Sequence, residues 1–217
     1  MIRAACVAMA LAAPVAGEAC DVALALTVDV SASISPTEFF LQMNGLADAL
    51  ADPEVADHLV AAEAARSLVQ WTGTSRQKIS LSWRQVRSAG DLAAFAAAVR
   101  ATPRTWSVFS TAIGEALLFT AGTFGEVGFC DRFVIDVSGD GLSNEGRDVQ
   151  AARDAVVASG ITVNGLAIET SIRFLSRYYE SHVIGGPGAV VERAADYADY
   201  GRAIRQKLLA EIIQPAF

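Results

Sequence analysis

The chain has 217 residues, of which 53% are hydrophobic and 19% charged, a composition that excludes a disordered protein and predicts one domain with a buried core. The 17 Lys and Arg residues against 24 Asp and Glu residues give a net charge of −7, and no basic run stands out. Nucleic acid and anionic membrane surfaces are therefore disfavoured as partners.

Residues 1–19 have the pattern of an export signal. Arg3 supplies a positive start, Ala4 to Ala13 form an apolar run too short to span a bilayer, and small residues follow from Pro14. Cleavage after Gly17 or after Ala19 fits this pattern. We expect an exported protein, in a bacterial periplasm or secreted, whose mature chain is a single domain over 20–217 without a transmembrane segment.

Two alternatives to this signal peptide remain open. Cys20 is the acylated residue in a lipoprotein interpretation, which Glu18 disfavours because small residues are expected before such a cysteine. A buried N-terminal helix is the other alternative.

The first element of the mature chain is a strand over Val22–Val30, a nearly continuous apolar run typical of a strand buried on both faces. Ser35 then provides an N-cap for a helix over Pro36–Leu50, with proline at its first position. Strands are predicted over Ala64–Trp71 and Lys78–Trp83. The short connection between them predicts a hairpin, so the second of the two is an antiparallel edge strand.

The rest of the chain alternates between helices and strands. Apolar spacing predicts helices around 92–99 and over 111–119, 147–159, 173–182 and 197–212, and strands over 133–137, 161–168 and 189–192. This order predicts an α/β fold: an open, doubly wound, mostly parallel six-stranded sheet with one antiparallel edge strand and helices on both faces.

Two cysteines remain after removal of the signal segment. Cys20 immediately precedes the first strand, and Cys130 precedes the strand over 133–137. If these strands are parallel neighbours, the two sulfurs meet at the same end of the sheet. We predict a Cys20–Cys130 disulfide in an oxidising compartment, and buried free thiols are the alternative.

Oxygen-bearing side chains follow the carboxyl ends of the predicted strands, where open α/β sheets bind their ligands. Asp29, Ser31 and Ser33 alternate at the end of the first strand. Thr111 opens a predicted helix, and Asp140 follows the strand that would neighbour the first. A set of carboxylates and hydroxyls suits a hard cation better than zinc or copper.

With these residues the chain resembles a von Willebrand factor type A domain, and the resemblance covers the mature chain. The metal-ion-dependent adhesion site of that family uses a D-x-S-x-S loop, a threonine before a helix and an aspartate after the fourth strand. The matching positions are Asp29, Ser31, Ser33, Thr111 and Asp140. The stretch 134–141 especially resembles a bacterial branch of secreted proteins with this fold and no known function.

Two details of this match leave alternatives open. Gly139 stands where the family usually has a threonine before the last aspartate, and Ser110 could supply the hydroxyl assigned to Thr111. The resemblance implies Mg²⁺, with Mn²⁺ or Ca²⁺ as alternatives. Neutral hydroxyls leave much of the cation's charge uncompensated, so an Asp or Glu carboxylate from a protein partner can complete its coordination.

Two further residues have both a functional and a structural interpretation. Asp136 lies in mid-strand, either next to the metal ligands or as a buried carboxylate held by the backbone or by arginine. Trp106, in the loop before Thr111, is a candidate for the partner surface or for the core.

Two other functions compete with metal-dependent binding. One is a scaffold or assembly module with a vestigial metal site. The other is a metal-dependent phosphohydrolase that uses Asp29, which is disfavoured because no general base and no lysine at a strand's carboxyl end are evident. We therefore predict a protein that is not an enzyme.

Overall fold

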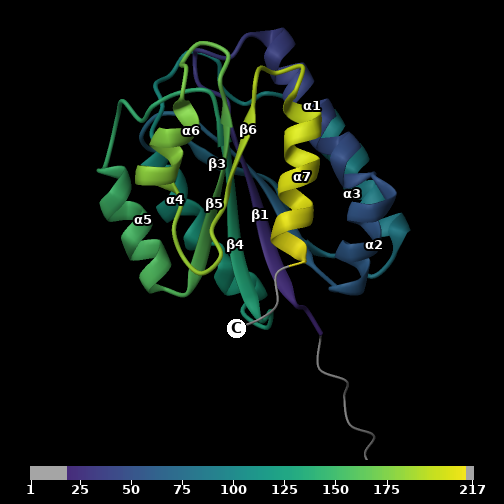
Figure 1. Ribbon diagram of the computed structural model, residues 1–217. Coiled ribbons are helices and arrows are strands. Elements are labelled where there is room, and N and C mark those ends of the chain that lie inside the picture. Colours follow the sequence, from purple (N-terminus) through teal and green to yellow (C-terminus); the bar gives the residue numbers. More distant parts are fainter. Residues whose placement is uncertain (1–18, 214–217) are drawn as a thin grey trace, which may run out of the picture.

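A computed structural model describes residues 19–213. A six-stranded sheet in the order β3-β2-β1-β4-β5-β6 forms its centre, and the only antiparallel pair in this sheet is β2 with β3 (Figure 1). The strands are β1 (Val22–Asp29), β2 (Ala65–Trp71), β3 (Gln77–Gln85), β4 (Arg132–Gly139), β5 (Ile161–Ile168) and β6 (Val191–Ala194). The predicted fold class is confirmed.

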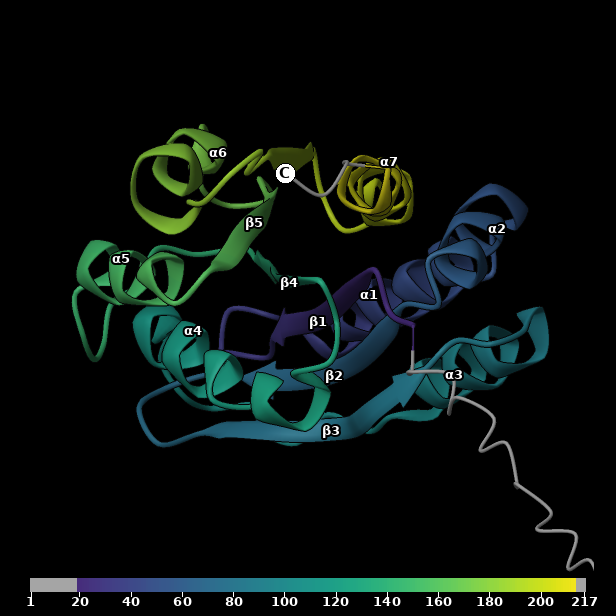
Figure 2. The same cartoon turned by 90° about the horizontal axis from the view of Figure 1, so that it is seen from below.

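Helices cover both faces of this sheet. They are α1 (Pro36–Leu50), α2 (Pro53–Ala61), α3 (Ala89–Ala101), α4 (Ile113–Ala121), α5 (Val149–Ala158), α6 (Leu175–Tyr178) and α7 (Tyr200–Ile212). Figure 2 shows α1, α2, α3 and α7 on one face and α4, α5 and α6 on the other. Each face has its own hydrophobic core, with the sheet between them.

Strand β1 lies in the middle of the sheet, and all eight of its residues are buried. Its neighbours β2 and β4 run parallel to it, so the carboxyl ends of the three strands meet at one edge. The Thr27 hydroxyl donates to the carbonyl of Asp136 at 2.9 Å and ties β1 to β4. This arrangement brings the residues that follow β1 and β4 close together.

Helix α2 occupies part of the segment 51–63, to which the sequence interpretation assigned no element. Its start carries a cap that is visible in the sequence, because the Asp52 side chain accepts hydrogen bonds from the amides of Glu54 and Val55, and Pro53 follows it. The helix predicted over 173–182 consists of the short α6 and a π-helical turn over Tyr179–Val183.

Other predicted boundaries shift by two or three residues. The helix expected from Thr111 begins at Ile113, so Thr111 lies in the loop before α4. The last helix begins at Tyr200 rather than Tyr197. The last strand is Val191–Ala194 rather than 189–192. These shifts matter mainly at Thr111, whose backbone amide and carbonyl bond to the loop after β4 rather than within a helix.

The predicted disulfide is confirmed. Cys20 and Cys130 are bonded, both are buried, and the Asp131 amide donates to the Cys20 carbonyl at 2.9 Å. The two alternative interpretations, a pair of free thiols and an acylated Cys20, are therefore wrong. Apart from Ala19, the predicted export signal lies outside the described residues. Within 19–213, no helix combines the length and apolar character needed to cross a bilayer.

Candidate metal centre

The candidate site begins where β1 leaves the sheet. Asp29 is the last residue of β1 and is fully buried, and its Oδ1 accepts the Ser31 amide at 2.7 Å. The loop is held from outside by Arg104, whose Nη2 donates to the carbonyls of Val30 at 3.0 Å and Ser31 at 2.8 Å. The turn after Asp29 is thus closed by its own carboxylate and by a cation from the loop before α4.

A chain of short contacts links side chains from three loops. The Ser31 and Ser33 hydroxyls lie 3.3 Å apart, and the Ser33 hydroxyl donates to Asp140 Oδ1 at 2.7 Å. The Thr111 hydroxyl donates to that of Ser31 at 3.3 Å. The structure therefore brings all five predicted ligands into one cluster of two carboxylates and three hydroxyls.

The loop containing Thr111 is fixed to the loop after β4. The Thr111 amide donates to Asn144 Oδ1 at 3.0 Å, and the amide of Asn144 donates to the Thr111 carbonyl at 2.9 Å. Ser110 is exposed, and its carbonyl accepts the Thr72 hydroxyl at 2.8 Å. Of the two candidate hydroxyls, Thr111 is the one that contacts Ser31.

Burial sets the electrostatics of the two carboxyl groups. The pKa of Asp29 is raised from 3.8 to about 7. Loss of solvent is the largest cause, and the nearby charge of Asp140 is the second. Burial also raises the pKa of Asp140, against hydrogen bonds that include the one from Ser33. Two buried carboxylates that repel each other are stabilised either by a proton on one of them or by a cation between them.

Gly139 is required by close packing beside Asp29. A Cβ there would lie 2.8 Å from the Tyr179 hydroxyl and 3.0 Å from Asp29 Oδ2. Tyr179, from the turn after α6, is fully buried, so its hydroxyl occupies the space into which a side chain at position 139 would project. This explains why glycine replaces the threonine expected from the family pattern.

The cluster fits a hard cation by its chemistry. In the described part of the chain, Asp29 Oδ2 is buried without a hydrogen-bond partner, which leaves an oxygen available for a cation. No group of three or more His, Cys, Asp or Glu side chains that could hold a metal occurs within residues 19–213. The candidate donor set therefore depends on its hydroxyls, as expected for Mg²⁺ more than for a thiolate or imidazole metal.

Two candidate residues lie apart from the five. Asp136 pairs with α7 instead, since its Oδ1 lies 2.7 Å from Lys207 Nζ. The structural interpretation of Asp136 as a buried, paired carboxylate holds, with lysine in place of arginine. Trp106 is half-buried in the loop between α3 and α4.

Sequence reasoning missed three residues around the cluster: Arg104, Tyr179 and Tyr197. Burial raises the pKa of the Tyr197 hydroxyl well above its usual range, and Asp140 and Asp29 add to this effect. None of the three lies in a local motif, because each reaches the site from a segment distant in sequence. Only the fold identifies them.

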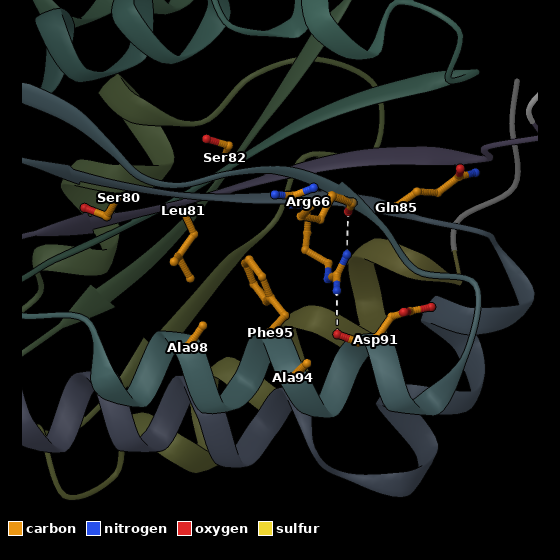
Figure 3. A pocket seen from close by; sticks show the side chains of 10 residues that line it. Arg66, Ser80, Leu81, Ser82, Gln85, Asp91, Ala94, Phe95 and Ala98 are labelled. Carbon is orange, nitrogen blue, oxygen red and sulfur yellow. Dashed lines mark hydrogen bonds between the residues drawn. The ribbon is translucent and has the colours of Figure 1, made fainter.

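A groove of about 420 Å³ lies between β3 and α3, away from this cluster. Figure 3 shows Leu81 and Phe95 facing each other across it, and Arg66 donating to the carbonyls of Arg84 and Asp91. The Arg66 guanidinium also stacks on the Phe95 ring at 4.5 Å. Since the polar groups of Arg66 are largely engaged by the protein itself, the groove is a less convincing site than the oxygen cluster.

The raised pKa of Asp29 predicts a pH-dependent effect on stability. Asp29→Asn keeps an oxygen for the Ser31 amide but removes the charge. A carboxyl group whose pKa is raised on folding destabilises the fold as pH rises from about 4 to about 7. We expect the variant to exceed the metal-free wild type in unfolding free energy by up to about 4 kcal/mol at about pH 8.

This difference should largely vanish at about pH 3, where the group is mostly protonated in both the folded and the unfolded state. Urea unfolding of both proteins in chelator, at several pH values, measures it. A difference that does not change with pH would contradict the assigned cause.

Comparisons with known proteins identify the family and the fold of the chain. A family model described as "Protein of unknown function (DUF1194)" matches residues 19–216. No curated protein matches the chain.

Among solved structures, proximal thread matrix protein 1 from the mussel byssus is similar with a TM-score of 0.70 and 14% identity, over 89% of this chain and 48% of that one. Another structure of that protein has zinc in its metal-ion-dependent adhesion site (MIDAS) motif. The pilus adhesin SpaC from Lactobacillus rhamnosus GG has a TM-score of 0.65 and 13% identity, over 90% of this chain and 31% of that one.

A von Willebrand factor type A protein from Catenulispora acidiphila is similar with a TM-score of 0.62 and 16% identity, over 89% of this chain and 43% of that one. The chain thus spans about half the length of the mussel protein, and less than half the length of the pilus adhesin and of the Catenulispora protein. At these identities the likeness shows the fold, which is that of a von Willebrand factor type A domain.

Proposed function

This chain belongs to the DUF1194 family of proteins of unknown function, and from that premise we propose that it is an exported binding protein that grips a protein partner through a divalent metal. Asp29, Ser31, Ser33, Thr111 and Asp140 would hold the cation. The observation that carries the proposal is the contact chain from Thr111 through Ser31 and Ser33 to Asp140, beside the buried Asp29.

The donor set supports binding rather than catalysis. A divalent cation, when bound, would take two carboxylates and three neutral hydroxyls from this set, which leaves a position of an octahedral shell open to a partner's carboxylate. His182, one of the chain's two histidines, stacks on Tyr178 and contacts the Ser181 hydroxyl. It is thus engaged elsewhere and does not serve as a general base at Asp29.

Two observations support the cellular setting. The buried Cys20–Cys130 disulfide is typical of an oxidising compartment, as expected for a periplasmic or secreted protein. Two of the similar solved structures are those of a byssus matrix protein and of a pilus adhesin. A scaffold with a vestigial site has the same fold and compartment, and differs only in lacking metal binding.

Titration calorimetry with Mg²⁺ tests the proposal. We expect a binding heat for the wild type that is absent in Asp29→Ala and in Asp140→Ala, because each variant removes one of the two carboxylates of the cluster. Asp154→Ala is a matched control, since that exposed carboxylate pairs with Arg153 far from the cluster. Parallel titrations with Mn²⁺, Ca²⁺ and Zn²⁺ identify the preferred cation.

The competing functions give different results. Absence of binding of any of these cations to the wild type would favour the scaffold. Turnover of phosphate esters that is lost in Asp29→Asn would favour the phosphohydrolase.

A further inference from the structure

The exposed apolar side chains of this protein are concentrated at the edge of the sheet that carries the oxygen cluster. Of the seven exposed large hydrophobic side chains in the described residues, four lie on segments at that edge: Phe40 (64% exposed), Val108 (73%), Leu142 (43%) and Phe174 (60%). The loops that follow β1, β4 and β5 lie together at the top of Figure 1. Clustered apolar exposure marks an interaction surface more often than chance exposure does.

These four residues come from four separate segments. Phe40 lies early in α1, and Val108 lies in the loop before α4. Leu142 follows Asp140 by two residues, and Phe174 immediately precedes α6. Since Ser33 is exposed, the cluster opens to solvent at the same edge.

Phe174 is held in an unfavourable backbone conformation while its ring faces solvent. Its φ of 64° and ψ of 26° fall in the left-handed region, which is rare for a bulky residue. The side chain of Glu169 anchors the segment, because it accepts the Ser176 amide at 3.1 Å and hydroxyl at 2.8 Å and pairs with Arg193 at 2.6 Å. Such strain is typical of sites that bind a ligand.

The loop that contains Val108 is also held in place by contacts of its neighbour Phe109. The Ala32 amide, in the loop after β1, donates to the Phe109 carbonyl at 2.9 Å. The Arg76 guanidinium stacks on the Phe109 ring at 3.7 Å. Val108 is therefore presented beside the D-x-S-x-S loop by a fixed backbone, which lowers the entropy cost of binding a partner there.

Charges on this edge favour an acidic partner. The side chains of Glu38 and Asp148 cap helices, since they accept the amides of Ser35 at 2.7 Å and Ala151 at 2.8 Å. Arginines 147, 173 and 177 are exposed in the same region, and the guanidinium of Arg177 lies 4.8 Å from the centre of the Phe174 ring. Glu38 and Asp148 are thus engaged by the protein's own backbone, while the three arginines are exposed and one of them, Arg147, lies 3.9 Å from Glu115.

We propose that Phe40, Val108, Leu142 and Phe174 form an apolar rim around the oxygen cluster, and that the partner is a protein presenting one carboxylate set within an apolar surface. The inference rests on the proposed function, because the carboxylate binds at the metal. The rim supplies apolar contacts around this polar centre, a distribution found at the energetic hot spots of protein interfaces.

The test uses a displayed library of short peptides with a fixed central aspartate and randomised flanks, selected on the Mg²⁺-loaded protein. We expect enriched peptides to carry large apolar residues next to the aspartate. The best peptide should bind about tenfold or more weakly to the double variant Phe174→Ser, Val108→Ser, by fluorescence anisotropy. The matched control is Phe119→Ser, Phe129→Ser, which removes two exposed aromatic rings outside the rim and should bind like the wild type.

Each other outcome is informative. Enrichment of polar flanks, failure to enrich any peptide, or equal weakening by both double variants would overturn the rim. Mg²⁺ calorimetry of the same variants separates this failure from failure of the proposed function, since the rim variants should keep the wild-type affinity for Mg²⁺. Absence of Mg²⁺ binding to the wild type would instead reject the proposed metal site.

Discussion

Replacement of Lys207 by methionine is expected to lower the free energy of unfolding by about 3–5 kcal/mol at neutral pH. Lys207 lies on α7 and is fully buried between two carboxylates. Its Nζ lies 2.7 Å from Asp136 Oδ1 and also contacts Glu211 Oε1. Its removal leaves two buried acidic groups without their cation, and that desolvation penalty is the physical reason for the loss.

The same helix offers a control. Arg205 pairs with Asp52 and Glu54, both at 2.7 Å, but its side chain is 37% exposed. Arg205→Met should therefore lower the free energy of unfolding much less than Lys207→Met does, as is usual for ion pairs in contact with water. Denaturant unfolding of both variants measures the contrast, and equal losses would contradict it.

The loss in Lys207→Met should also depend on pH. Burial raises the pKa of Glu211 from 4.5 to about 7 even with Lys207 beside it. A group with a raised pKa destabilises the fold as pH rises, so the variant should lose less stability at about pH 5, where Glu211 accepts a proton, than at about pH 8. Adding Asp136→Asn and Glu211→Gln to Lys207→Met should restore part of the stability at neutral pH.

Removal of the disulfide is the second large effect. The bond between Cys20 and Cys130 closes a loop with a sequence separation of 110 residues and joins the starts of β1 and β4. In the chain-entropy model, the double variant Cys20→Ser, Cys130→Ser should lose about 5 kcal/mol of unfolding free energy. The bond acts on the unfolded chain, so the fold of the variant is expected to be unchanged.

Reduction of the wild type provides the control for this prediction. Its unfolding free energy in a thiol reductant should fall to that of the double variant, while the variant itself should not respond to the reductant. A double variant as stable as the oxidised wild type would show that the cross-link contributes nothing. These measurements use residues 20–217, which contain both cysteines.

The sheet and its order of elements could be predicted from the sequence because the signals are local. The uninterrupted apolar run at β1 indicates burial on both faces, and the cap at Ser35 marks the start of α1. The position of each cysteine before a strand predicted their bond. Helix α2 was missed although Asp52 and Pro53 carry its start signal, because only nine residues follow before the chain turns to β2.

The candidate ligands could also be selected from the sequence, since each stands at the end of a predicted element. Their mutual contacts could not. Long stretches of chain separate Asp29 from Thr111 and Asp140. The parallel pairing of β1 with β4 brings Asp140 within hydrogen-bond distance of Ser33, and the loop before α4 brings Thr111 to Ser31. Whether a metal binds there is the question that calorimetry answers.

The sequence by itself thus determined the α/β class, the parallel sheet, the disulfide partners and a short set of candidate oxygen ligands, because hydrophobic period, capping residues and spacing are properties of neighbouring residues. Tertiary structure alone decided the rest. It placed the Tyr179 hydroxyl against Gly139, buried Lys207 between Asp136 and Glu211, and raised the pKa of Asp29. Burial and charge proximity depend on segments far apart in the chain, which no local pattern records.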